Sequence, residues 1–366
     1  MESVAAFTDT YLPTVNGVTY TVKTWRERWQ ARGGRMDVVY PASSEYPPGR
    51  GEHPVRSLPF PFYEGFRLGV PKIPREVRDA TVVHAHTPFG LGVAALRLSR
   101  RENLPFVASY HTPLGEYAEY LTSRKRLGRD IERLSRRYER WFFDRADAVL
   151  APSDTTRRRL RHEIGVDTEV IALSNGVDVD RFRPVDARAF RERHGLGDGP
   201  LVGYTGRHGY EKCLSDALAA AAGLDVTVAF AGDGPARSDL EAEARRRGLD
   251  AHFLGFLDRE ELPAFYSALD AFVFPSPVET EGVVAKEAIA CGTPVVGVNA
   301  GALATTVDHE ETGFHFESGD LDGFREGIRR ALAENDRLRE HCVAHRDAVS
   351  VEHSLDRLAD VYDRLV

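Results

Sequence analysis

The sequence of 366 residues has little sulfur, and it has no long apolar run. Its three cysteines, Cys213, Cys291 and Cys342, are an odd number without the spacing of a metal site, which favours reduced thiols in a cytosolic chain. No apolar run reaches the roughly 18 residues that a membrane helix needs, and no signal peptide is apparent. We therefore expect a cytoplasmic protein without a transmembrane helix. Peripheral attachment at the cytoplasmic face of a membrane stays open.

Lysine is also scarce. The chain has 48 basic and 56 acidic residues, for a formal net charge of −8, and this balance gives no reason to expect a nucleic-acid partner. Lysine accounts for five of the 48 basic residues, at positions 23, 72, 125, 212 and 286. A lysine inside a motif therefore stands out from a background of arginine.

Apolar strands alternate with amphipathic helices along the whole chain, which is typical of doubly wound parallel sheets. A chain of this length exceeds one ordinary core and suits two domains. We predict domains at 1–184 and 185–350, followed by a terminal segment, 351–366, whose helix runs from Ser354 to Leu365. Strands are predicted near residues 3–7, 36–40, 81–84, 105–109, 147–150 and 169–172, and again near 200–205, 225–230, 251–254, 271–274 and 294–297.

The segment from Glu279 to Glu287 carries the strongest chemical signal. The apolar run 271–274 predicts a buried strand, and residues 283–290 predict a helix, so Glu279 falls on a loop and Glu287 on the helix. A carboxylate at the carboxyl end of a strand can accept hydrogen bonds from sugar hydroxyls, and the free amides of a helix N-terminus suit a phosphate. The alternative is an acidic residue that complements a helix dipole, next to an ordinary surface glutamate. Because Glu287 lies in so apolar a helix, we favour a binding role for it.

A second group of candidate residues follows the predicted strand 200–205. The sequence Gly-Arg-His-Gly-Tyr-Glu-Lys at 206–212 places Arg207 and Lys212 at the carboxyl end of that strand. A diphosphate leaving group gains negative charge as a glycosidic bond breaks. A guanidinium and an ammonium group can stabilise that charge without a metal ion.

Five motifs, in this order, resemble those of retaining GT-B glycosyltransferases of family four, and nearly the whole chain fits the resemblance. The first motif has the form common among diacylglycerol glucosyltransferases and related mannosyl and sulfoquinovosyl transferases. The motifs are Phe7 to Val18, Val107 to Thr112, Leu173 to Asp178 with Phe182, Gly206 to Lys212, and Glu279 to Glu287.

The resemblance implies an α/β GT-B fold, in which two Rossmann-like doubly wound domains face a central cleft and segment 351–366 crosses back to the first domain. It also implies a nucleotide-sugar donor, retention of configuration and no cofactor. The implied catalytic residues are His111, Arg207, Lys212 and Glu279. The implied donor-binding residues are Gly17, Arg207, Lys212, Glu279, Glu281, Gly282, Val283 and Glu287.

Each of these residues has an expected role. Glu287 is expected to bind the ribose, while Arg207, Lys212 and the amide of Gly17 bind the diphosphate. The base is expected near the loop that follows the strand near 251–254. Glu279 would hold a sugar hydroxyl. His111 would lie beside the anomeric carbon, although a histidine after a strand can also cap the next segment. The departing phosphate would itself take the acceptor proton.

Residues 121–145 are strongly basic. They carry nine basic and four acidic side chains, a local charge of +5, so the rest of the chain carries −13. On a helix, apolar residues from Leu127 to Phe142 form one stripe among arginines, which suits an anionic bilayer surface. The alternative is a packed helix with a solvated arginine face. The side chains expected to face the membrane are Arg126, Arg129, Arg133 and Arg137.

Other motifs are weaker. Phe60, Phe62, Tyr63 and Phe66 lie among prolines, where they either pack on the first domain or line a groove for an acceptor such as a lipid. Three further motifs suggest no site of their own. They are Asp178-Val179-Asp180, which follows the Asn175-Gly176 turn and is not interpreted as a metal site; His84-Ala85-His86, a strand end without a third zinc ligand; and Gly232-Asp233-Gly234, a loop that lacks the third glycine of a dinucleotide turn.

The sequence thus predicts a hexosyltransferase that moves glucose from UDP-glucose to a membrane glycerolipid. A GDP-mannose-dependent mannosyltransferase, or transfer to a soluble or polysaccharide acceptor, is the alternative. A phosphorylase would need a much longer chain and a pyridoxal-bearing lysine, and the basic helix fits a 2-epimerase poorly. A non-enzymatic module that binds nucleotide sugars is disfavoured because Arg207, Lys212, Glu279 and Glu287 are all present.

Overall fold

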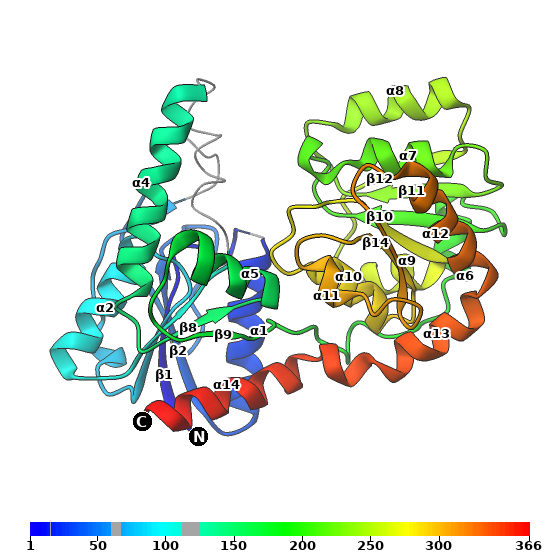
Figure 1. Cartoon of the computed structure of the whole chain (residues 1–366). Helices are drawn as coiled ribbons and strands as arrows, with labels where there is room; N and C mark the ends of the chain where they lie inside the picture. The colour runs from blue at the N-terminus through cyan, green and yellow to red at the C-terminus, as the bar shows by residue number, and fades with distance from the viewer. Residues whose placement is uncertain (15, 60–66, 112–124) are drawn as a thin grey trace. The chain divides into compact units, whose positions relative to one another are not determined.

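The computed structural model describes residues 1–14, 16–59, 67–111 and 125–366. The chain forms two compact units. Unit 1 combines Met1–Asn175 with Ser354–Val366, and unit 2 is Gly176–His353. Figure 1 shows the ribbon of both units, each built around its own sheet.

Unit 1 contains a seven-stranded sheet in the order β3-β2-β1-β6-β7-β8-β9, in which every paired strand is parallel. Its strands are β1 (Ser3–Phe7), β2 (Arg35–Pro41), β3 (Glu52–Val55), β6 (Val82–Ala85), β7 (Phe106–Ser109), β8 (Ala148–Ala151) and β9 (Val170–Ala172). The central strands are buried on both faces, which explains their continuous apolar sequences. A separate antiparallel pair joins β4 (Ser57–Pro59) to β5 (Arg67–Gly69).

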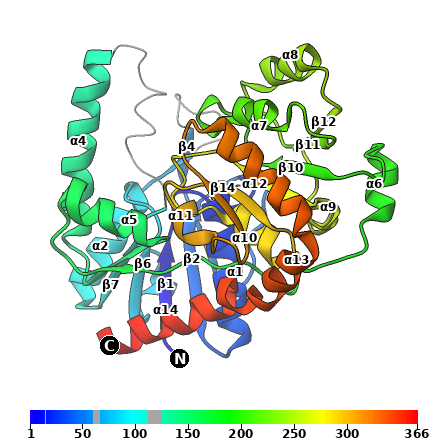
Figure 2. The ribbon, with the colours of Figure 1, turned by 45° about the vertical axis from the view of Figure 1, so that its right-hand side comes forward.

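The helices of unit 1 cover this sheet. They are α1 (Gly17–Ala31), the short η1 (Arg75–Val77), α2 (Gly90–Glu102), α4 (Lys125–Phe143), α5 (Asp154–Arg159), the π-helical η2 (Leu160–Ile164) and most of α14 (Val351–Leu365). Asn16 caps α1, because its side-chain oxygen accepts the amide hydrogen of Thr19 at 2.9 Å. The last helix packs on unit 1, where the ring of Tyr362 meets that of Trp29 edge to face. Figures 1 and 2 both show the two chain ends side by side.

Unit 2 contains a six-stranded parallel sheet in the order β12-β11-β10-β13-β14-β15. Its strands are β10 (Leu201–Thr205), β11 (Thr227–Ala231), β12 (Ala251–Gly255), β13 (Ala271–Phe274), β14 (Val295–Val298) and β15 (Gly313–Phe316). Its helices are α6 (Arg188–His194), η3 (Tyr210–Lys212), α7 (Leu214–Ala221), α8 (Arg237–Arg247), α9 (Leu262–Ala268), α10 (Val283–Ala290), α11 (Leu303–Thr306), α12 (Leu321–Ala333), α13 (Asn335–Ala344), η4 (Arg346–Val349) and the first turn of α14.

All eleven predicted strands are present, each shifted by no more than two residues at either end. The prediction missed β3, β4, β5 and β15. β3 and β15 are edge strands, and β3 contains Pro54, a residue that sheets tolerate at their edges but that argues against a strand in the sequence. The chain divides into units at Asn175 and Gly176, nine residues before the predicted boundary at 184. In the ranges that the structure describes, no helix is both long and apolar enough to cross a bilayer.

Candidate functional site

The candidate site of unit 2 lies where the strand order of its sheet reverses. From β10 the chain moves outward through β11 and β12, and it then returns to place β13 on the other side of β10. In open parallel sheets, ligands bind outside the carboxyl ends of the strands at such a point. The loops that follow β10 and β13 are the two loops that carry the sequence motifs.

Lys212 and Glu279 meet across this point. Nζ of Lys212 lies 2.5 Å from Oε1 of Glu279, and the two side chains are only 19% and 15% exposed. Glu279 lies on the loop after β13, as predicted. A second bond joins the same loops, because the hydroxyl of Ser276 donates to the carbonyl oxygen of Glu211 at 3.4 Å. The structure therefore brings one cation and one carboxylate of the predicted set together.

Arg207 lies on the more exposed side of the same loop. Its guanidinium is 2.7 Å from Oε1 of Glu211, and its side chain is 48% exposed. An exposed ion pair of this kind is weak, so the guanidinium can exchange its partner for a ligand at little cost. The sequence analysis did not assign Glu211, which lies between the two cations in the chain.

Helix α10 begins at this site. Its cap residue, Gly282, has φ of 70° and ψ of 41°, a left-handed conformation that glycine adopts without strain. A Cβ atom here would lie 3.0 Å from the side chain of Leu303. The buried carboxylate of Glu281 pairs with Nζ of Lys286 at 3.0 Å. The carboxylate of Glu281 is thus bound within the chain.

Glu287 is buried on the next turn of α10. Its Oε2 accepts the hydroxyl hydrogen of Tyr266 at 2.7 Å. Burial raises the pKa of Glu287, while Arg259, the bond from Tyr266 and Arg181 act to lower it. Sequence reasoning missed Tyr266 and Arg259. No local pattern marks either residue, because both reach Glu287 only through the tertiary fold.

Two glycine-containing loops pack closely beside the site. The amide of His208 donates to the carbonyl oxygen of Asp233 at 2.8 Å. A Cβ atom on Gly232, which has φ of 108°, would lie 2.0 Å from the carbonyl oxygen of Gly206. The segment 232–234 therefore supports the loop that carries Arg207 and Lys212.

In unit 1, Gly17 is the first residue of α1, directly after the capping Asn16. A Cβ atom on Gly17 would have no neighbour within 4 Å in the described chain. The first amides of a helix have no partner within the helix itself, and here the side chain of Asn16 accepts the amide hydrogen of Thr19.

His111 lies two residues beyond β7 and is half-buried. Its Nε2 is 3.1 Å from Nδ1 of His86, which directly follows the neighbouring strand β6. The ring of His86 also stacks on that of His84, at a centroid distance of 4.1 Å. The sequence analysis considered the His84-Ala85-His86 pair without His111. In the described ranges, no group of three His, Cys, Asp or Glu side chains could hold a metal ion.

The basic helix α4 exposes part of its apolar stripe. The side chains of Leu134 and Trp141 are 68% and 40% exposed, while Phe142 is buried in the core of unit 1. Arg133 and Arg137 are exposed beside Leu134. The side chains of Arg126 and Arg129, and all of the aromatic residues Phe60, Phe62, Tyr63 and Phe66, lie outside the described residues.

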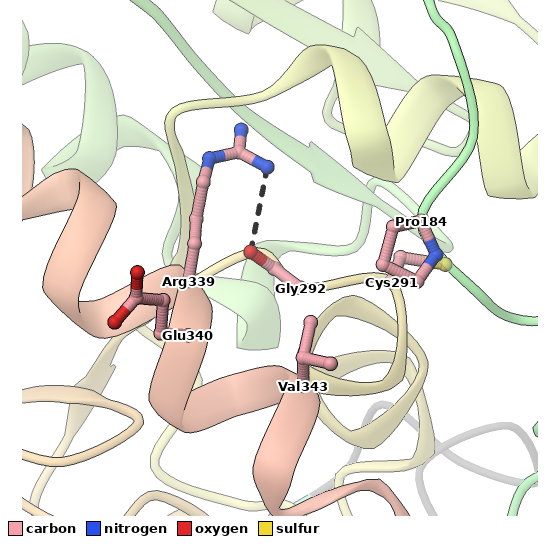
Figure 3. Close-up of a pocket in the computed structure, with 6 residues that line it drawn as sticks. All are labelled: Pro184, Cys291, Gly292, Arg339, Glu340 and Val343. Atoms are coloured by element: carbon pink, nitrogen blue, oxygen red, sulfur yellow. Dashed lines mark hydrogen bonds between the residues drawn. The ribbon is translucent and has the colours of Figure 1, made fainter.

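Two further features of unit 2 lie apart from these loops. The Oδ1 atom of Asp178 accepts the amide hydrogens of Asp180 and Arg181, at 3.2 and 3.3 Å, so the segment forms a turn. A cavity of about 450 Å³ lies at the carboxyl end of α10, opposite the end that carries Gly282. Figure 3 shows its lining residues Pro184, Cys291, Gly292, Arg339, Glu340 and Val343.

Both halves of the sequence match glycosyltransferase families. Residues 15–181 match Glycosyltransferase Family 4, and residues 186–346 match Glycosyl transferases group 1. The fold agrees with this assignment. The structure superposes on sucrose-phosphate synthase from Thermosynechococcus elongatus with a TM-score of 0.79, at 23% identity over 100% of this chain and 99% of the other. The chain is therefore a GT-B glycosyltransferase, as predicted, and it belongs to family 4.

Relatives with differently named transferase activities match the chain. A GDP-mannose-dependent alpha-mannosyltransferase of Mycolicibacterium smegmatis is 31% identical over 90% of this chain and 87% of its own length. The sulfoquinovosyl transferase SQD2 of Arabidopsis thaliana is also 31% identical, over 76% of this chain, which spans 56% of that protein. The alpha-monoglucosyldiacylglycerol synthase of Streptococcus pneumoniae is 26% identical over 98% of this chain and 85% of its own length.

Proposed function

We propose that this glycosyltransferase transfers glucose from UDP-glucose to a membrane glycerolipid, with retention of configuration at the anomeric carbon. The observation that carries the donor assignment is the contact between Lys212 and Glu279 at the switch point of unit 2. A cation and a carboxylate at one edge of the sheet match the diphosphate and the sugar of a nucleotide sugar, because the diphosphate is anionic and the sugar carries hydroxyl donors.

In this proposal Lys212 and Arg207 stabilise the diphosphate as it leaves. Lys212 is already held by Glu279, so its ammonium group is positioned before the donor binds. Glu279 accepts a hydrogen bond from a sugar hydroxyl, and Glu287 accepts one from the ribose. The amide of Gly17 and the amides at the start of α10 complete the contacts to the phosphates. His111 lies beside the sugar in this proposal.

Three observations support the choice of UDP-glucose and a lipid. A structural neighbour, Anabaena Alr3699/HepE, has been crystallised with UDP and glucose, and this chain superposes on it with a TM-score of 0.79. The alpha-monoglucosyldiacylglycerol synthase relative acts, by its name, in glycerolipid synthesis. On this chain, the exposed Leu134 and Trp141 among the arginines of α4 suit the surface of an anionic bilayer.

A GDP-mannose-dependent mannosyltransferase is the second candidate. It is favoured by the relative of Mycolicibacterium smegmatis, which is 31% identical over 90% of this chain. The two candidates differ in the nucleotide base as well as the sugar, so a donor screen separates them.

The test incubates the full chain with UDP-glucose, UDP-galactose or GDP-mannose, with and without diacylglycerol in anionic vesicles. Lipid products are identified by mass spectrometry, and the anomeric configuration of the product is read by proton NMR. The proposal expects an α-glucosyl lipid from UDP-glucose, with turnover that survives EDTA because Arg207 and Lys212 stabilise the leaving group. A mannosyl product would favour the second candidate. Loss of activity on chelation, restored by magnesium or manganese, would overturn the metal-free assignment.

A further inference from the structure

A chain of three imidazole rings extends through the interior of unit 1 to the predicted sugar-binding histidine. The ring of His84 stacks on that of His86 at a centroid distance of 4.1 Å, and His86 meets His111. His84 and His86 are 0% and 1% exposed, whereas His111 is half-buried. The function proposed above uses His111 and gives no role to the other two rings.

His84 fixes the inner end of this row of imidazole rings. Its Nδ1 lies 2.6 Å from the hydroxyl of Tyr362 on α14, and its Nε2 lies 2.8 Å from the hydroxyl of Ser109. Both ring nitrogens are therefore occupied, and the ring cannot turn without breaking two buried hydrogen bonds. The indole of Trp25 packs against both His84 and His86, at centroid distances of 6.1 and 5.8 Å. His86 is thus held between fixed aromatic rings.

His86 and His111 meet edge to edge. Their rings are parallel within 10°, their centroids are 5.4 Å apart, and Nδ1 of His86 lies 3.1 Å from Nε2 of His111. This is hydrogen-bond geometry between two ring nitrogens. One nitrogen must donate and the other must accept, so the bond couples the tautomer of His111 to that of His86.

The surroundings of His86 decide the direction of this bond. Burial, followed by the charges of His84 and His111, holds the pKa of His86 well below its ordinary value, so the ring is neutral and carries one hydrogen. Its Nε2 has no hydrogen-bond partner among the described residues. A buried N–H without a partner is rarer in proteins than an under-used acceptor. The hydrogen is therefore on Nδ1, which donates to Nε2 of His111.

We propose that His86 is a positioning residue that holds His111 in the tautomer with its hydrogen on Nδ1. With its hydrogen on Nδ1, His111 accepts the bond from His86 at its Nε2. The catalytic role of this tautomer rests on the proposed function, because an N–H group held in one position suits a hydrogen bond to an oxygen atom of the sugar. The tautomer itself is independent of the substrate.

The test compares three variants of the full chain. His86→Phe keeps an aromatic ring in the stack but removes the donor, and His86→Asn restores an N–H near the position of Nδ1. Tyr362→Phe is the matched control, because it removes a hydrogen bond from His84 and leaves the bond between His86 and His111. The tautomer of His111 is read by long-range proton–nitrogen NMR on protein labelled with ¹⁵N-histidine, with His111→Gln used for assignment.

The expected result is an Nδ1–H tautomer of His111 in the wild type, in His86→Asn and in Tyr362→Phe, and its loss in His86→Phe. With an active donor, His86→Phe should lower kcat by about tenfold or more with little change in the donor KM, as removal of a group that orients a functional histidine does in other sites. The proposal is overturned if His86→Phe leaves the tautomer unchanged, or if Tyr362→Phe alters it equally. Absence of transfer from every donor would instead count against the proposed function, since the NMR result needs no substrate.

Discussion

The ammonium group of Lys212 lies 2.5 Å from Oε1 of Glu279, across a separation of 67 residues in the chain. Neither residue lies on a strand, yet the adjacent strands β10 and β13 direct both loops to the same edge of the sheet. The side chains are mostly screened from water, so their attraction is stronger than that of a surface pair. In the proposed function, this contact positions a cation for a diphosphate and a carboxylate for a sugar.

Replacement of Lys212 tests this positioning. Lys212→Ala should lower kcat by about 10²-fold or more, on the order of the loss seen when one stabiliser of a developing negative charge is removed. Lys72→Ala, at an exposed lysine of unit 1, is the control and should leave kcat unchanged. A folded Lys212→Ala protein with normal kcat would remove this residue from the leaving-group site.

Replacement of Glu287 should weaken nucleotide binding rather than lower kcat. Calorimetry with UDP should show at least about tenfold weaker binding for Glu287→Ala, because a buried hydrogen bond to a charged group is worth about 1.5–3 kcal/mol. Tyr266→Phe keeps the ring but removes the hydroxyl that contacts Glu287, and a smaller loss is expected. Since the pKa of Glu287 is raised, affinity should also decrease on acidification sooner than for an ordinary glutamate. Wild-type affinity in Glu287→Ala would contradict the ribose assignment.

The exposed arginines of α4 should govern attachment to vesicles. Arg133→Gln combined with Arg137→Gln should reduce sedimentation with anionic vesicles, and the remaining binding should weaken as salt rises, because surface charges are screened within about 10 Å at 0.1 M. The matched control is Arg245→Gln combined with Arg246→Gln, an equal charge change at exposed residues of α8 in unit 2. Equal binding to neutral and anionic vesicles would leave α4 as a solvated helix and favour a soluble acceptor.

Asp9 should make the stability of unit 1 depend on pH. Its carboxyl is buried, and burial raises its pKa from 3.8 to about 6, although it accepts hydrogen bonds from the hydroxyl of Thr87 and the amide of Leu91. Between these two pH values the folded state binds a proton that the unfolded state does not. The free energy of unfolding should therefore fall as the pH rises from about 4 to about 6, by up to about 1.4 kcal/mol per pH unit.

Asp9→Asn separates this contribution from the other titrating groups. Wild type should be more stable relative to the variant at pH 5 than at pH 8. All three tryptophans, Trp25, Trp29 and Trp141, belong to unit 1, so fluorescence during urea unfolding monitors this unit. A stability difference that does not change with pH would show that Asp9 titrates normally.

Local sequence patterns were sufficient to predict the fold class, the central strands and the loops that carry the motifs. Buried parallel strands need continuous apolar runs, and the ends of a helix are marked by local sequence signals. The strand at 271–274 and the helix at 283–290 could therefore be predicted from the sequence. The same local rules placed Glu279 on a loop and Glu287 on a helix. Edge strands such as β3 were not predicted, because a short strand that contains a proline lacks a continuous apolar run.

Which side chains meet depends on the three-dimensional fold. Tyr266 reaches Glu287, His86 reaches His111 and Lys212 reaches Glu279 because neighbouring strands and helices bring distant segments together. Periodicity shows which residues are buried but gives no information on their partners across the sheet. The pKa of a buried group such as Asp9 depends on those partners and on exclusion of water, so it follows from packing in three dimensions rather than from residue order.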